Sequence, residues 1–147
     1  MFELPSDAAA RQLGNTLESW TAAAWLRPLD WAFGRFLWHE APDASPWLIM
    51  AATLASHQLG RGHVCLDLAS ILEDPTLALS LPPEGTGEAE PESASPPPAP
   101  QEVFKGLSLA VWREALNHPR LVSNGEGSNP LVVVGNRVYL RRFWAYE

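Results

Sequence analysis

Residues 56–68, SHQLGRGHVCLDL, gather most of the residue types in this chain that could do chemistry. The stretch contains Ser56, two histidines, the only cysteine of the sequence, Cys65, and Asp67, arranged around a Gly-Arg-Gly turn. This set could supply a hydrolase site, a metal site or a phosphate-binding loop. The alternative is architectural: the stretch is then the end of a helix followed by a reversing turn.

The spacing of these residues favours architecture over chemistry. Ser56 and His57 are adjacent, so on a helix their side chains point about 100° apart and cannot serve each other as nucleophile and base. His57 and His63 lack an HExxH-like spacing and a third ligand nearby, and the phosphate-loop pattern G-x-x-x-x-G-K-[ST] is absent from the sequence. Cys65 beside His63 has no evident orienting group. We therefore predict no catalytic residue, no metal site and no cofactor in this chain.

The architectural interpretation gives each residue of the stretch a local task. Gly60 is predicted to end the helix in a conformation with positive φ, and Gly62 to let the chain reverse. His57 and His63 are expected to bond backbone groups around the turn, and Asp67 to cap the short helix that follows. Three apolar residues alternate along the returning segment and are predicted to point inward: Val64, Leu66 and Leu68.

The net charge of −7 over 147 residues is concentrated in one segment. Residues 82–102 contain no Lys, no Arg and no aromatic residue, and many of the 14 prolines. A segment of this composition cannot bury enough apolar surface to offset the entropy of ordering it. The sequence therefore predicts a single domain over residues 1–147, interrupted at about residues 82–102 by a disordered acidic, proline-rich insertion. Its acidic residues are Glu84, Glu88, Glu90, Glu92 and Glu102.

Three helices are predicted before the insertion. The first begins at Asn15, with Glu18 in the capping-box position, and repeats apolar residues at helical spacing. The third has Ser45 as its N-cap and Pro46 at its first position. The third helix is apolar nearly all round, which is typical of a central, buried helix.

The second helix, RPLDWAFGRFLWHE, is predicted to begin at Pro28, a residue suited to the first helical position. Trp31 and Trp38, seven residues apart, are predicted to lie opposite its core-facing side. The residues predicted to face the core are Leu29, Ala32, Phe33, Phe36 and Leu37.

After the insertion, the sequence predicts a fourth helix and a β-hairpin. The helix is capped by Ser108 and stops at Pro119, and the hairpin turns at Gly135-Asn136. Two pairs are predicted to lie opposite each other on one face: Val133 with Val138, and Leu131 with Leu140. The other face is predicted to carry Arg137, Tyr139 and Arg141. The fold class is thus α+β, a mostly helical small domain of about four to five helices with a C-terminal β-hairpin.

Three segments resemble the N-terminal domain of the alpha subunit of exodeoxyribonuclease V, the RecD family. Residues 54–68, LASHQLGRGHVCLDL, are similar to a signature of that domain, and residues 26–37, LRPLDWAFGRFL, look like its second helix. Residues 130–147, PLVVVGNRVYLRRFWAYE, resemble its closing hairpin. The segments occur in the family's order, and the insertion lies outside the resemblance.

The resemblance implies a function that the residues alone do not show. Members of the RecD family are superfamily 1 helicase subunits that move 5′ to 3′ on DNA, within a three-subunit helicase–nuclease that processes double-strand breaks for recombination. Their ATP-binding loop belongs to motor domains that follow this one, and it has no counterpart in the present 147 residues. The resemblance therefore implies a non-catalytic docking domain whose partners are the beta and gamma subunits, above all the RecC-like gamma subunit.

Neither a secretory signal nor an apolar run of the roughly 20 residues that a membrane span requires is visible in the sequence. We therefore expect a cytoplasmic protein without membrane contact, which meets DNA only through the complex.

Seven tryptophans are many for a domain of this size, and aromatic residues are enriched in protein interfaces. We therefore predict Trp31 and Trp38 as the partner interface, with a second layer of the domain covering them as the structural alternative. A competing hypothesis is a winged-helix-like DNA-binding module, in which the fourth helix reads DNA. The hairpin would then contact DNA through Arg137, Arg141 and Arg142.

Overall fold

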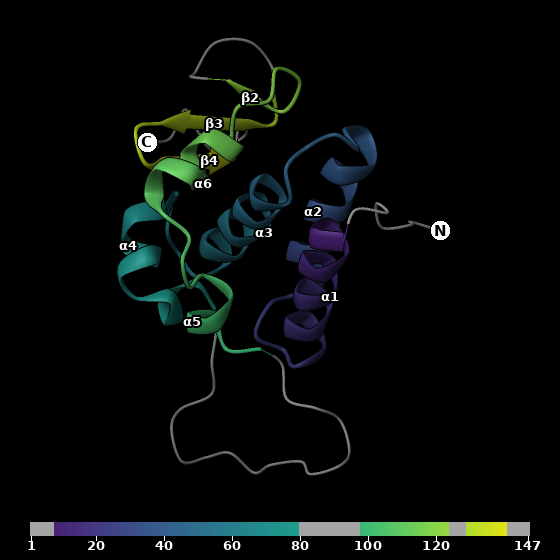
Figure 1. The fold of residues 1–147 in the computed structure, drawn as a ribbon, viewed down its shortest axis with the longest axis vertical. Helices are drawn as coiled ribbons and strands as arrows, with labels where there is room; N and C mark the ends of the chain where they lie inside the picture. Colours follow the sequence, from purple (N-terminus) through teal and green to yellow (C-terminus); the bar gives the residue numbers. More distant parts are fainter. Residues whose placement is uncertain (1–7, 80–97, 124–128, 141–147) are drawn as a thin grey trace.

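The computed structural model describes residues 8–79, 98–123 and 129–140 (Figure 1). The α-helices in these ranges are α1 (Ala8–Ala22), α2 (Pro28–Glu40), α3 (Pro46–Gly60), α4 (Leu68–Glu73), α5 (Pro100–Val103) and α6 (Leu109–Ala115), and a 3₁₀-helix, η1, spans Pro75–Ala78. The strands are β1 (Leu66–Asp67), β2 (Val122–Ser123), β3 (Leu131–Val134) and β4 (Arg137–Leu140). The predicted α+β class, mostly helical with a late hairpin, is confirmed.

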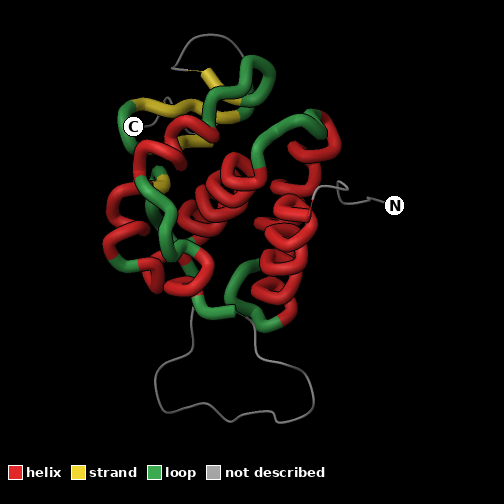
Figure 2. The backbone as a smooth tube through the Cα atoms, viewed as in Figure 1, coloured by secondary structure: helices red, strands yellow, loops and turns green. Residues whose placement is uncertain are grey.

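Helix α3 lies at the centre of the molecule. Figure 2 shows α1 and α2 together on one side of it, with the short helices and the sheet on the other. The side chains from Leu48 to Gln58 are buried, which confirms the prediction of a central helix. The predicted caps are also confirmed, because Pro46 begins the helix and the Ser45 hydroxyl accepts a hydrogen bond from the Trp47 N–H at 3.1 Å.

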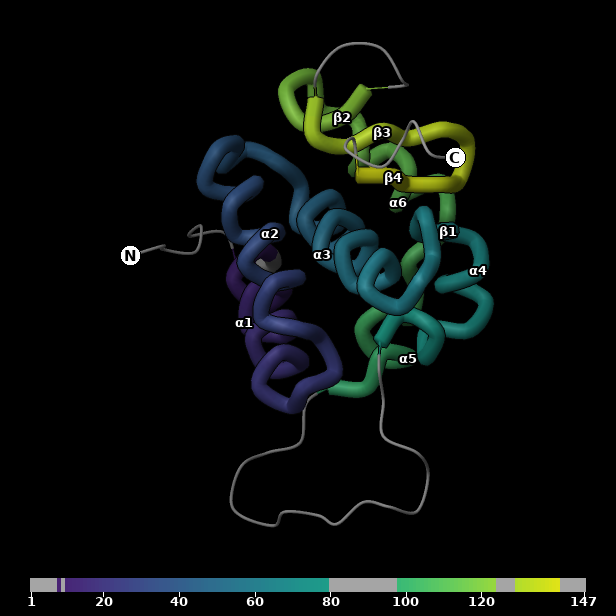
Figure 3. Tube along the Cα trace, turned by 180° about the vertical axis from the view of Figure 1, so that it is seen from behind, coloured from purple at the N-terminus to yellow at the C-terminus, as the bar shows by residue number. Residues whose placement is uncertain are grey.

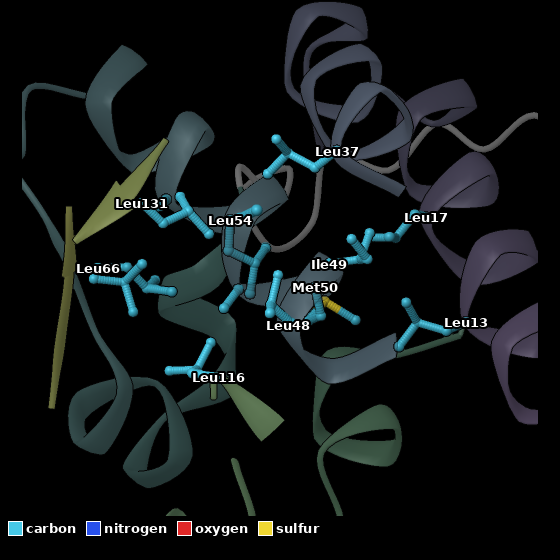
Figure 4. Close-up of a cluster of buried hydrophobic side chains, with 14 of the residues drawn as sticks. Leu13, Leu17, Leu37, Leu48, Ile49, Met50, Leu54, Leu66, Leu116 and Leu131 are labelled. Atoms are coloured by element: carbon cyan, nitrogen blue, oxygen red, sulfur yellow. The ribbon is translucent and has the colours of Figure 1, made fainter. Parts of the chain in front are cut away.

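One hydrophobic core surrounds α3 (Figure 4). Leu17 of α1 packs on one side of the helix, and Leu66 and Leu131 of the sheet pack on the other. All three side chains are fully buried, and each such burial stabilises the fold by about 1.5–3 kcal/mol. The core therefore binds segments from both ends of the chain to one helix.

The sheet has the strand order β1-β4-β3-β2, with β2 parallel to β3 and the other pairs antiparallel. The predicted hairpin register is confirmed: Val133 lies opposite Val138, and Leu131 lies opposite Leu140. Gly135 has a φ of 63°, as a tight turn requires. Tyr139 lies between Val138 and Leu140 on β4 and so on the other face of the hairpin, as predicted. Tyr139 is 3% exposed and its cross-strand partner Val132 is fully buried, so this second face is also covered at these two positions.

Two helix boundaries differ from the predictions. Helix α1 begins at Ala8, so Asn15 lies within the helix and does not cap it. The preceding Ala-rich residues have high helix propensity and extend the helix backwards past the apparent capping box. Helix α6 is capped as predicted, since the Ser108 hydroxyl accepts a bond from the Val111 N–H, but it ends at Ala115, before Pro119.

The predicted insertion lies outside the described residues except for residues 98–102. Helix α5 begins within this part, and Pro100 is buried. The indole N–H of Trp20 donates a hydrogen bond to the Pro98 carbonyl at 2.8 Å. The predicted end of the insertion at Glu102 is therefore too late, because a core tryptophan and a helix already hold the chain from Pro98 onward.

Candidate functional site

Two of the segments singled out in the sequence, residues 26–37 and 54–68, meet at one buried carboxylate. Asp30, in the first turn of α2, is fully buried, and Ser56 and His57, near the end of α3, both reach it. The Ser56 hydroxyl donates to Asp30 Oδ1 at 2.7 Å, and His57 Nδ1 lies 2.7 Å from Oδ2. Arg27 places its Nη2 2.7 Å and its Nε 3.1 Å from Oδ1. We call these four residues the Asp30 cluster.

Backbone groups complete the Asp30 cluster. The Arg27 N–H donates to Asp30 Oδ2 at 2.9 Å, which satisfies one of the free donors at the start of α2. Arg27 Nη2 also donates to the Ser56 carbonyl at 2.9 Å, so the guanidinium joins the start of α2 to the end of α3.

The hydrogen bonds decide the protonation state of Asp30. Burial alone would raise the pKa of its carboxyl group, but the bonds from His57, Arg27 and Ser56 outweigh burial and hold the pKa well below its usual range. The bond to Asp30 in turn raises the pKa of the Arg27 guanidinium. The cluster is therefore centred on a charged carboxylate that is paired and fully bonded.

The arrangement of Ser56, His57 and Asp30 differs from a hydrolase triad. In a triad, the hydroxyl donates to the histidine, whose other ring nitrogen donates to the carboxylate. Here the hydroxyl and the ring contact different oxygens of the same carboxylate, so the hydroxyl proton points to Asp30 and the histidine does not take it. All three residues are less than 9% exposed. The cluster thus links two helices and does not present a nucleophile to a substrate.

Metal-ligating side chains do not cluster in the described ranges. No group of three or more His, Cys, Asp or Glu residues there is placed to hold a metal ion.

Two glycines permit the close packing of α2 on α3, the most extensive contact between any two elements. A Cβ on Gly34 would collide with the Thr53 hydroxyl, and a Cβ on Gly60 would overlap the Arg27 guanidinium. Gly60 lies within the helix, and Gly62, with a φ of 95°, makes the reversal. The prediction of a positive φ at Gly60 is therefore wrong, because glycine supplies space there and not a special backbone conformation.

His57 was predicted to bond backbone groups around the turn, and its Nδ1 instead lies against the Asp30 carboxylate, while His63, given the same prediction, is exposed. Of the remaining residues of the signature, three follow the architectural interpretation and one does not. Asp67 caps α4 as predicted, since its Oδ1 accepts from the Ala69 and Ser70 N–H groups. Leu66 and Leu68 are fully buried. Val64 is 45% exposed, which contradicts its predicted inward position, because β1 begins only at Leu66 and the alternation does not extend before it.

The structure places Trp31 and Trp38 in the core, where they are 3% and 1% exposed. The prediction that they lie opposite the core-facing side of α2 is wrong. Gly34 lies on the same side of the helix and lets α3 approach closely, so this side becomes the packed one. Within the described ranges, neither indole N–H has a hydrogen-bond partner. The two tryptophans thus offer no surface to a partner in this structure.

Three of the five residues predicted to face the core form an exposed apolar stripe instead. Leu29 is 63% exposed, Phe36 is 58% exposed, and Ala32 between them is also exposed. Phe33 is half-buried, and only Leu37 of the predicted set is in the core. Figure 3 shows α2 on the near side of the molecule, in front of α1. We call Leu29, Ala32 and Phe36 the outer face of α2.

The residues of the alternative DNA-binding hypothesis are described only in part. Arg137 is exposed at the start of β4, and Arg141 and Arg142 lie outside the described residues. A groove of about 720 Å³ separates α6 from the sheet, and its lining includes Arg113 and Glu114. The two opposite charges leave this groove without a clear electrostatic preference.

A comparison with protein families matches residues 22–139 to RecD_N, described as the N-terminal domain of the RecBCD enzyme subunit RecD. The chain belongs to this family. The match includes the whole Asp30 cluster and the outer face of α2, and it confirms the resemblance found in the three segments. No curated protein matches the chain in a sequence search.

Two features of α2 in this RecD-family domain were not predicted from the sequence. They are the buried Asp30 and the side of the helix that packs against α3. Asp30 stands between Leu29 and Trp31 in an otherwise apolar segment, three residues after Arg27. An acidic residue in such a position signals a buried partner. The glycine between the two tryptophans was the available signal for the packed side of the helix.

Proposed function

We propose that this domain docks a RecD-type subunit onto its partner subunits in the RecBCD enzyme and does no chemistry itself. The observation that carries the proposal is the outer face of α2. It places two large apolar side chains, Leu29 and Phe36, in solvent about two turns apart on one helix. Contiguous apolar patches of this kind mark interaction sites more often than free surface.

The partners that the family implies are the beta and gamma subunits, and we favour the RecC-like gamma subunit. An interface of this kind concentrates its energy in a few large side chains at the centre of the contact. DNA is then reached only through the complex. None of the described helices is both long and apolar enough to span a membrane, and we propose a cytoplasmic location on the strength of the family.

The absence of chemistry is supported by the geometry of the Asp30 cluster, which turns the Ser56 hydroxyl toward a carboxylate. We expect the purified chain neither to hydrolyse ATP nor to cut DNA. DNA-stimulated ATP turnover that disappears when one of its own residues is changed would contradict this part of the proposal.

The docking role is tested by the double variant Leu29→Gln with Phe36→Gln. We expect its affinity for the purified gamma subunit to fall at least tenfold, since losing one central interface side chain commonly costs more than 1 kcal/mol. A matched control is Leu77→Gln with Val111→Gln, which removes two other exposed apolar side chains and should leave the affinity unchanged.

Circular dichroism and thermal melting separate binding from folding in this experiment. Both double variants should melt close to the parent chain, because all four side chains are largely exposed. A folded Leu29/Phe36 variant that binds the gamma and beta subunits with parental affinity would overturn the proposal.

DNA binding through a winged-helix-like arrangement is the less supported function. Helix α6 spans only Leu109–Ala115, and its exposed Arg113 stands next to the exposed Glu114. A helix that reads DNA is expected to carry several basic or polar side chains on one face. The outer face of α2 consists of apolar residues, which suit contact with a protein and not with DNA. It is therefore the stronger candidate surface, and docking is the better supported function.

A further inference from the structure

Arg35 borders the outer face of α2. This residue is half-buried and lies between the exposed side of the helix and the packed one. Its guanidinium carbon stands 5.6 Å from the ring centroid of Trp31, one turn earlier on the helix. A guanidinium at this distance over an indole is attracted to the ring face, so the side chain is held in place before any partner arrives.

Arg35 lacks a carboxylate partner in the part of the chain that the structure describes. The ion pairs found there involve Arg27, His57 and His118. The Nε atom of Arg35 is buried and has no hydrogen-bond partner among the described residues. A buried donor left in this state costs free energy, so Arg35 has bonding capacity that the isolated domain does not use.

Arg27, at the other end of the same helix, has a guanidinium that is hydrogen-bonded within the domain. It places two nitrogens on Asp30 Oδ1 and a further bond on the Ser56 carbonyl. Both arginines flank the same apolar stripe, but among the described residues only Arg27 of the two has a carboxylate partner. Arg35 is therefore the one of this pair that can take a carboxylate from a partner.

We propose, on the basis of the docking function above, that the partner surface covering α2 is an apolar protein surface that places a carboxylate against Arg35. The fork geometry of a guanidinium matches a carboxylate and gives the interface its register, while Leu29 and Phe36 supply the apolar contact. A nucleic-acid backbone fits less well, because phosphate binding usually takes several cations and the other arginine beside the apolar stripe, Arg27, is already bonded to Asp30.

The test uses the full chain and the purified gamma subunit, with affinity measured at two salt concentrations. Arg35→Glu should weaken binding at least tenfold, and the parent chain should lose less affinity in high salt than a DNA-binding protein does. Arg35→Lys, which keeps the charge but loses the fork, should fall between the parent and Arg35→Glu. The matched control is Arg113→Glu, an exposed arginine on α6, which should bind like the parent.

Changing one gamma-subunit carboxylate to Arg should restore binding to Arg35→Glu and weaken binding to the parent. This reciprocal rescue separates a direct ion pair from a loss of the Arg35–Trp31 packing, which a change on the partner could not repair. Melting of each variant checks that the fold is intact, and Arg35→Lys keeps the test valid if Arg35→Glu proves unstable.

The outcomes separate this inference from the docking function. If the folded Arg35→Glu binds the gamma subunit like the parent while Leu29→Gln with Phe36→Gln does not, the carboxylate is absent and the docking function stands. If all these variants bind like the parent, the docking function fails and the inference fails with it. If Arg35→Glu loses affinity for DNA but none for the gamma subunit, the cation serves a nucleic acid and the inference is overturned.

Discussion

Two histidine–aspartate pairs in the described part of the chain are alike in chemistry but differ in the exposure of the aspartate. His57 Nδ1 lies 2.7 Å from Asp30, whose side chain is 0% exposed, whereas His118 Nε2 lies 3.0 Å from Asp43, whose side chain is 77% exposed. Asp30 is surrounded by donors from three residues, while Asp43 can be hydrated on most of its surface. The surroundings of each pair, and not the pair itself, therefore decide how much the carboxylate contributes to the stability of the fold.

The physical reason lies in what remains when the carboxylate is removed. Without Asp30, the donors of Arg27, Ser56 and His57 would face one another in a region that water cannot readily reach. Breaking a buried pair by removing one partner is strongly destabilising, whereas exposed ion pairs contribute little. The two pairs should therefore respond differently to the same substitution.

The largest expected effect is that of Asp30→Asn. The amide keeps the shape of the carboxylate but loses its charge and turns N–H donors toward other donors. We expect the free energy of unfolding to fall by about 3 kcal/mol or more, measured by urea denaturation followed through tryptophan fluorescence. A loss no larger than that of the matching Asp43→Asn variant would show that the Asp30 cluster does not organise the fold.

A smaller effect is expected when the pH is changed. It concerns the difference in the free energy of unfolding between the parent chain and Asp30→Asn. Because the pKa of Asp30 is lower in the folded chain, its contribution is fully present above the unfolded pKa of about 4 and is lost as pH falls toward the folded value. The stability gap between the parent chain and Asp30→Asn should therefore be constant from pH 7 to 5. It should shrink below pH 4 by about 1.4 kcal/mol per pH unit.

Urea denaturation of both proteins at pH 6, 4 and 3 checks this dependence. A gap that stays the same at pH 3 and pH 6 would mean that the ionised carboxylate is not the source of the stability.

The smallest effect is expected for Asp43→Asn. Its pKa is also lowered, chiefly by the hydrogen bond with His118, but the side chain is largely exposed to water and an amide oxygen can accept the same bond. The urea midpoint should stay within experimental error of the parent value. A clear loss of stability would erase the contrast between the two pairs and indicate that His118 depends on Asp43 for its position.

The periodicity of the sequence was sufficient to predict α3 and the hairpin. Helix α3 has a Ser-Pro start and an apolar surface on every side, so its central position follows from composition alone. The hairpin has one turn signal, Gly135-Asn136, and the register follows from it. In both cases, local residues and the final packing favour the same structure.

Helix α2 could not be oriented from its sequence because two of its sides are apolar. The side with more aliphatic and phenyl groups was predicted to be buried, and the side with Trp31, Gly34 and Trp38 is the one that packs. The deciding factor was the fit of Gly34 to Thr53, a contact between residues on different helices. The same limitation hid the link from Asp30 to His57, which no spacing along the chain reveals.

The pairing of β1 with β4 has a consequence for the acidic segment between residues 80 and 97. Leu66 lies opposite Val138, and the Leu68 N–H donates to the Asn136 carbonyl at 2.9 Å, so the sheet closes a loop that contains this whole segment. The entropy of closing a flexible loop rises only with the logarithm of its length, by about 0.6 kcal/mol per doubling. A chain with a shorter or longer segment at this place should therefore close the same sheet at nearly the same cost, so that the length of the segment can change while the fold stays the same.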